Sequence, residues 1–287
     1  MLYGAIEAGG TKFVCAVADE SLDILERISI PTTVPKETMD QVITFFKQYN
    51  TSIISVGSFG PIDVDKKSSK YGYITNTPKE GWRDFDFKGT LEREFNVPIL
   101  WTTDVNAAAY GEFKLGAAQN SESCLYLTVG TGIGGGLVRN GEIINGYTHP
   151  EMGHILVRKN ERDDFEGTCP SHGDCLEGLA SGFAIEKRYG ENGKDLEESH
   201  PIWDYVSNYL AQALMTYTLT MSPEKIILGG GVMKQQHLLD LIREKFELIM
   251  NNYMEYPIIS EYINTPGLGD DAGILGCLSL AKDELNS

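Results

Sequence analysis

Short apolar runs separated by clustered glycines open the chain, and the same arrangement returns near its middle. Glycines placed between two apolar runs favour a tight hairpin over the start of a helix. Each half is therefore expected to begin with three strands. The predicted strands are 3–8, 11–18 and 24–30 in the first half, and in the second half 124–129, one that begins at 137 after a glycine-rich turn at 130–136, and 142–144.

Helical periodicity alternates with short apolar runs after each triple of strands. This order predicts an α/β fold in which a mixed sheet is flanked by helices, built twice as two lobes with a cleft between them. Fragments of this kind also arise in α/β chains without a duplication. The expected helices are 37–49, 91–95, one opening at 104, 201–221, 238–254 and 271–285, and the expected strands are 53–57, 99–103, 226–228 and 258–263.

Composition narrows the class of protein. The 41 acidic residues outnumber the 24 basic ones, giving a net charge of −17, so nucleic acid and anionic membranes are not expected partners. No apolar run approaches the ~20 residues of a membrane span, and no basic stretch precedes the first strand. Five cysteines, an odd number, favour a reducing compartment over a disulfide framework. We therefore expect a cytoplasmic protein.

The glycine clusters are candidate phosphate sites. Residues 130–136 contain G-x-G-x-x-G, but a strand and a hairpin turn follow, where a dinucleotide site needs a helix. The chain has no P-loop motif either. Exposed backbone N–H groups in such a turn, helped here by the Thr131 hydroxyl, form an anion-binding concavity. Residues 7–12 offer a similar turn that carries Lys12, and residues 229–231 form a third cluster. Alternatively, the glycines serve only tight turns.

A lone carboxylate stands where a strand meets a helix. Asp104 follows the strand 99–103 and opens an alanine-rich helix. It is either an N-cap residue or a base that accepts a hydroxyl proton during group transfer.

Two histidines and two cysteines form a candidate metal site. His154, Cys169, His172 and Cys175 have the spacing H-x14-C-x2-H-x2-C. Four such ligands suit a tetrahedral, structural zinc ion, since no position remains open for water. His149 competes with His154 as the first ligand. The alternative is that the two cysteines and two histidines are unlinked.

Together these motifs resemble the repressor–open reading frame–kinase (ROK) family, over nearly the whole chain. The resemblance implies a two-lobed actin-like, ribonuclease H-like ATPase fold. It also implies a homodimer that uses ATP and Mg²⁺ to phosphorylate a hexose at its 6-OH. The stretches 7–12 and 169–175 resemble the zinc-containing fructokinase branch. Glucokinase, mannokinase and N-acetylmannosamine kinase are the nearest alternatives. A sugar-sensing repressor is disfavoured, because such proteins carry an additional N-terminal helix-turn-helix module.

The resemblance also implies lobes and residue roles. The small sugar and phosphate lobe is expected at 1–117, completed by a C-terminal helix at 271–287, and the large nucleotide lobe with the zinc loop at 118–270. Asp104 is the expected base. Glu151 and Glu177 are expected to contact the sugar, and the alternative is that they are solvated surface acids. Glu7 stands where most of the family has aspartate, which leaves its part in orienting Mg²⁺ unassigned, and His172 replaces the middle of three cysteines. The implied sugar contacts are Gly60, Pro61, Asn76, Thr103, Glu151, His154 and Glu177, the nucleotide contacts are Gly9, Gly10, Thr11, Lys12, Thr131, Gly132, Ala180, Leu228, Gly229, Gly230, Gly231 and Val232, and the zinc ligands are His154, Cys169, His172 and Cys175.

Overall fold

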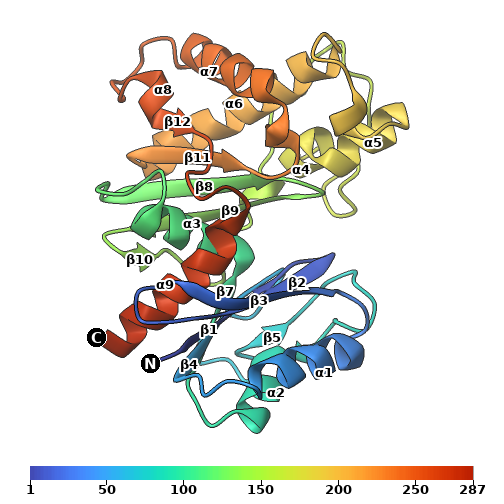
Figure 1. Ribbon diagram of the computed structural model, residues 1–287. Helices are drawn as coiled ribbons and strands as arrows, with labels where there is room; N and C mark the ends of the chain where they lie inside the picture. Colours follow the sequence, from blue (N-terminus) through green and yellow to red (C-terminus); the bar gives the residue numbers. More distant parts are fainter. Residues whose placement is uncertain (287) are drawn as a thin grey trace.

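A computed structural model describes residues 1–286, and residue 287, the last of the expected C-terminal helix, lies outside the described residues. Two five-stranded sheets form the centres of two bodies stacked one above the other (Figure 1). Their strand orders are β3-β2-β1-β4-β7 and β10-β9-β8-β11-β12. In each sheet the first three strands along the chain pair antiparallel, and the last two join in parallel. The predicted repetition is thus confirmed in topology.

The first sheet is covered on both faces, as its uninterrupted apolar strands predict. Alternate residues of β1 point to opposite sides, so that Ile6 packs beneath α1 and α2 while Ala5 faces the last helix. Helix α1 begins at a proline, which suits the first turn of a helix. The elements of this part are β1 (Tyr3–Ala8), β2 (Lys12–Ala18), β3 (Ile24–Pro31), α1 (Pro35–Phe46), β4 (Ile53–Ser58), β5 (Tyr73–Ile74), β6 (Phe85–Asp86), α2 (Phe87–Glu94) and β7 (Ile99–Thr103).

The second sheet packs beneath the long helix α6 and its neighbours α4 and α7. Asn140 and Gly141 both have positive φ, 53° and 78°, as the expected hairpin requires. The elements are β8 (Ser123–Val129), β9 (Ile133–Arg139), β10 (Glu142–Ile143), η1 (Met152–His154), α4 (Leu176–Ala180), α5 (Gly182–Tyr189), η2 (Gly193–Asp195), α6 (Ile202–Met221), β11 (Lys225–Gly229), η3 (Val232–Lys234), α7 (Gln236–Met250), α8 (Ile259–Tyr262), β12 (Ile263–Asn264) and η4 (Gly269–Asp271).

Three element predictions in this half are wrong in extent or type. The glycine turn is shorter than 130–136, because β9 already begins at Ile133 and Gly134 to Gly136 pair with β8. The helix expected over 238–254 ends at Met250, where Asn251 turns left-handed. The strand expected over 258–263 is mostly helix α8, and only β12 pairs with β11.

Helices α3 (Asp104–Leu115) and α9 (Ala272–Asn286) lie between the two sheets and pack against each other (Figure 1). Small residues permit their close approach. A Cβ on Gly276 would lie 1.7 Å from the Ala107 carbonyl oxygen, and one on Gly111 would lie 2.3 Å from that of Ala272. Helix α3 contributes alanines to the cores of both bodies. None of the helices within residues 1–286 has the length and apolar character needed to cross a membrane.

Candidate active site

Two neighbouring cavities meet at Asp104. The larger, of about 700 Å³, opens between the first glycine turn, the second glycine turn and the loop that carries Glu151. The smaller, of about 390 Å³, lies between β8, the end of β11 and the start of α9. Asp104, Val105 and Thr128 line both cavities. Asp104 is the ionisable residue among these three, so one carboxylate faces both spaces.

Asp104 is the first residue of α3, and the alternative that it caps the helix is wrong. The cap is Thr103, whose hydroxyl accepts the Asn106 N–H at 3.1 Å. The Asp104 carboxylate instead accepts the N–H of Val105 at 2.9 Å. Burial raises the pKa of Asp104 to about 6, and the nearby negative charge of Glu151 adds to the effect. A carboxylate with this pKa is ionised at neutral pH and can accept a proton.

Glu7 shares the smaller cavity with Asp104. Its side chain crosses toward α9, where a Cβ on Gly273 would lie 2.6 Å from its carboxyl carbon. Burial, and secondarily the charge of Asp104, raises the pKa of Glu7 to about 7. A buried acid whose pKa is raised further by a neighbouring carboxylate lies in an electrostatic environment that a cation would relieve.

The glycine clusters converge on these cavities. Both turns are closed by backbone bonds, from Gly9 N–H to the Lys12 oxygen at 3.0 Å and from Gly130 N–H to the Gly132 oxygen at 2.9 Å. Of the expected nucleotide contacts, the larger cavity is lined by Gly10, Thr11, Thr131 and Gly132, and the smaller by Leu228, Gly229 and Gly230. The others, outside both linings, are Gly9, Lys12, Ala180, Gly231 and Val232.

All of the residues expected to contact sugar line the larger cavity. Glu177 on α4 also accepts the Ile133 N–H at 2.9 Å and so ties the second glycine turn to the metal loop. The residues brought together here come from both bodies: Gly60, Pro61, Asn76, Thr103, Glu151, His154 and Glu177.

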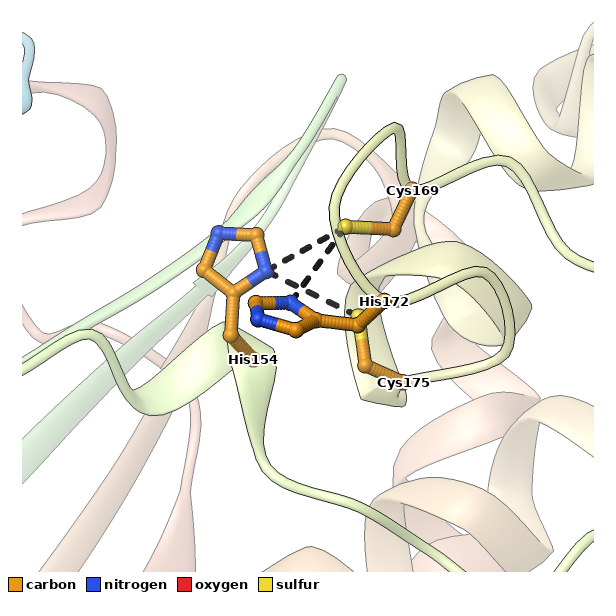
Figure 2. Close-up of side chains that lie close together, drawn as sticks. All are labelled: His154, Cys169, His172 and Cys175. Atoms are coloured by element: carbon orange, nitrogen blue, oxygen red, sulfur yellow. Dashed lines mark hydrogen bonds between the residues drawn. The ribbon is translucent and has the colours of Figure 1, made fainter. Parts of the chain in front are cut away.

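The four candidate metal ligands point toward one another (Figure 2). Nδ1 of His154 lies 3.5 Å from Sγ of Cys169 and 3.6 Å from Sγ of Cys175, and Nδ1 of His172 lies 3.6 Å from Sγ of Cys169. Zinc–nitrogen and zinc–sulfur bonds at a tetrahedral centre put neighbouring ligand atoms about 3.5 Å apart. The donor set therefore fits zinc.

His149 is not part of this cluster, because its Nε2 accepts the Ile62 N–H at 3.1 Å. Of the two histidines that competed for the first position, His154 is the one beside the cysteines. Its Nε2 lies 3.9 Å from Glu177, as expected where a carboxylate orients a metal-binding histidine.

Sequence reasoning missed several residues of the smaller cavity, among them Tyr126, Lys234 and Asp270. Lys234 and Asp270 form an ion pair of 2.9 Å that joins η3 to η4. Thr128 and Tyr126 precede the glycine turn at alternate strand positions, a pattern that places both on one face. Nothing in the sequence distinguishes that face from the other.

A sequence profile described as "ROK family" matches residues 3–284. The chain belongs to the ROK family. It is 50% identical over 287 residues to a protein named "Fructokinase" from Pediococcus pentosaceus, covering all of both chains. It is 47% identical over 287 residues to a "Fructokinase" from Streptococcus mutans, covering 98% of this chain and 97% of the relative.

Solved structures of ROK proteins share its fold. A ROK hexokinase from Thermus thermophilus matches with a TM-score of 0.82 and 26% identity, covering 100% of this chain and 99% of that one. A ROK glucokinase from Streptomyces griseus, solved with glucose and AMPPNP, matches with a TM-score of 0.77 and 24% identity, covering 99% and 100%. The expected two-lobed actin-like fold is therefore confirmed.

Proposed function

We propose that this ROK protein is a fructokinase, which transfers the γ-phosphate of ATP to the 6-OH of fructose. The observation that carries the proposal is the position of Asp104 at the junction of the two cavities. The choice of fructose rests on the relatives named fructokinase that match over the full chain. Glucokinase, mannokinase and N-acetylmannosamine kinase activities are the competing outcomes.

Asp104 accepts the proton of the sugar hydroxyl as the bond to phosphorus forms. Phosphoryl transfer depends on positioning and on neutralising charge, so the remaining residues are assigned to those tasks. Glu151, His154 and Glu177 orient the hexose, together with Asn76 and the Gly60-Pro61 loop. Thr103, beside Asp104, completes the sugar contacts.

The nucleotide is assigned to the glycine clusters. The backbone N–H groups of Gly10, Thr11, Thr131 and Gly132 are assigned to the phosphates, since those of Gly9 and Gly130 close their own turns. Gly9 and Lys12 support the first turn, and residues 228–232 with Ala180 are assigned to the adenosine. Mg²⁺ bound with the triphosphate would supply charge neutralisation, and Glu7 is the carboxylate that we assign to orient the hydrated ion. Closure of the lobes excludes water from the reacting groups.

Zinc is assigned a structural part. Held by His154, Cys169, His172 and Cys175, it would fix the loop that presents His154 and Glu177 to the sugar.

We further propose a lobe boundary between residues 117 and 118, with 271–287 completing the first lobe and 118–270 forming the second. A cytoplasmic homodimer that binds neither nucleic acid nor membranes completes the proposal.

A hexose panel tests the function. ATP-dependent phosphorylation should give the highest kcat/KM with fructose, ahead of mannose, glucose and N-acetylmannosamine, and Asp104→Ala should lower kcat by at least about a thousandfold. A preference for another hexose would refute the substrate. Wild-type activity in Asp104→Ala would refute the assignment of the base.

A further inference from the structure

His149 has no part in the zinc cluster, yet it is enclosed at the edge of the sugar cavity. It lies in the loop between β10 and η1, is 7% exposed and lines the larger cavity together with Glu151. Burying a polar ring is unfavourable unless its nitrogens find partners. The two ring nitrogens of His149 face two different parts of the molecule.

Nε2 faces the first lobe. It accepts the backbone N–H of Ile62 at 3.1 Å, in a buried contact. A ring nitrogen that accepts a hydrogen bond carries no proton, so the neutral ring must carry its proton on Nδ1. The Ile62 contact thereby fixes the tautomer.

Nδ1 faces the sugar-binding loop. It lies 3.7 Å from Oε1 of Glu151, a carboxylate whose side chain is 45% exposed. This separation is longer than a hydrogen bond, but bonds in an active site commonly shorten when the ligand is bound. With the proton on Nδ1, a small rotation of the Glu151 side chain would bring the carboxylate into a charge-assisted bond.

The ring also lies behind the loop that bears the sugar contacts of the first lobe. A Cβ on Gly60 would lie 3.5 Å from Cε1 of His149. Gly60, Pro61 and Glu151 all line the larger cavity. His149 thus touches a loop of one lobe through Nε2 and faces an acid of the other through Nδ1.

We propose that His149 is a positioning residue, which couples the place of the 60–62 loop to the orientation of Glu151 toward the sugar. The proposal rests on the proposed function, because Glu151 is there a sugar contact. When the lobes close on a hexose, the loop carries His149 with it, and its Nδ1–H holds the carboxylate in place. His149 would thereby contribute to sugar affinity without touching the reacting atoms.

Kinetics of His149→Ala test the proposal. Loss of a hydrogen bond to a charged group should raise the fructose KM on the order of tenfold, while the ATP KM stays within about twofold of wild type. Zinc content should be unchanged, since His149 is not a ligand. His200→Ala is a matched control, because Nδ1 of His200 also accepts a backbone N–H, that of Ile202 at 3.2 Å, outside the linings of both cavities. Its kinetics should equal those of wild type.

Two further measurements separate positioning from a purely structural part. In the Glu151→Ala background, which leaves no acceptor for the Nδ1–H, His149→Ala should change the fructose KM less than about twofold, because residues that act as a unit are not additive. In the wild-type protein, ¹⁵N NMR of the ring, assigned by its loss in His149→Ala, should show the proton on Nδ1. Multiplicative KM effects in the double variant, or a proton on Nε2, would overturn the proposal.

Failure of the proposed function gives a different result. A wild-type protein that phosphorylates no hexose refutes the function itself, and one that prefers another hexose refutes the substrate, after which the same comparison is made with that hexose. An active wild-type enzyme whose sugar KM is unchanged by His149→Ala refutes the inference alone.

Discussion

Replacing Asp104 by asparagine should make the protein more stable at neutral pH while abolishing its activity. The partly buried carboxylate has a pKa of about 6, above its ordinary value of 3.8, chiefly because burial disfavours the charged form. The folded state therefore holds a proton that the unfolded chain has released between these values. Stability falls as pH rises through that window, and the full penalty is present above about pH 6.

The displacement of the pKa from 3.8 to about 6 corresponds to about 3 kcal/mol. This value is an upper limit, because Asp104 is only partly buried and water in the two cavities screens part of its charge. We expect Asp104→Asn to raise the free energy of unfolding by about 2 kcal/mol at pH 8. Relief of Glu7, whose pKa Asp104 also raises, acts in the same direction.

Urea unfolding of the ligand-free proteins at pH 8, 6 and 4.5 measures the effect. The advantage of the variant should shrink as the pH falls and approach zero only below about pH 3.8, where the wild-type carboxyl becomes protonated in the unfolded state as well as in the folded state. Equal stabilities of wild type and variant at pH 8 would refute the reasoning, since they would show that the folded protein does not penalise this charge.

Asp163→Asn is the control of opposite sign. Burial alone would raise the pKa of Asp163, but hydrogen bonds from Arg188 and Tyr209 outweigh it and hold the pKa below the ordinary value. Its carboxylate therefore contributes stability above the unfolded pKa, and this contribution is lost as pH falls through the folded pKa. The variant should be less stable than wild type at pH 8, which distinguishes the Asp104 effect from a general consequence of removing an acid.

Two further changes test the metal loop and the helix crossing. Cys175→Ser should lose zinc, measured as metal per chain, and should melt several degrees lower with weaker fructose binding. Cys124→Ser, remote from the cluster, is the control and should retain the metal. Zinc at the wild-type ratio in Cys175→Ser would contradict the site. Gly276→Ala places a methyl 1.7 Å from the Ala107 carbonyl oxygen and should cost about 3 kcal/mol or more in urea unfolding. In Gly146→Ala the methyl meets nothing nearer than 3.9 Å, and this variant should stay within about 0.5 kcal/mol of wild type; equal stabilities of the two glycine variants would show that α3 and α9 can separate freely.

The sequence predicted well those elements whose pattern of residues is compatible with only one type of secondary structure. Buried apolar runs such as residues 53–57 become central strands, and Asn140-Gly141 suits a two-residue hairpin. The prediction failed at 258–263, where apolar residues at 258, 259, 262 and 263 were compatible with a strand. The sheet pairs only the last of these. One helical turn buries Tyr262 against Phe246 of α7 while Ile258 stays 69% exposed.

The sequence pointed to many residues of the candidate site, but it did not show which of them contact one another. The position of Asp104 between a strand and a helix and the spacing of the metal ligands brought these residues out, because both patterns reflect local chemistry, whereas Glu151 was implied only by the family resemblance. The sequence could not decide between His149 and His154 as the metal ligand. The fold decides it, because it places the Ile62 N–H against His149. The same limit applies to Tyr126 and Asp270, whose place in the smaller cavity depends on the packing of β8 beside the start of α9.

The packing of α3 against α9 explains why the folded protein keeps the Asp104 carboxylate at a position where its charge is unfavourable. Asp104 is at the first turn of α3, where the helix dipole favours a negative charge, yet burial still raises its pKa. The glycines let α3 pack closely against α9, so a shift of α3 that relieved the charge would also disturb this packing. The start of α9 lines the smaller cavity, and the start of α3 lines both. This close crossing of two helices therefore holds Asp104, the proposed base, between the two cavities.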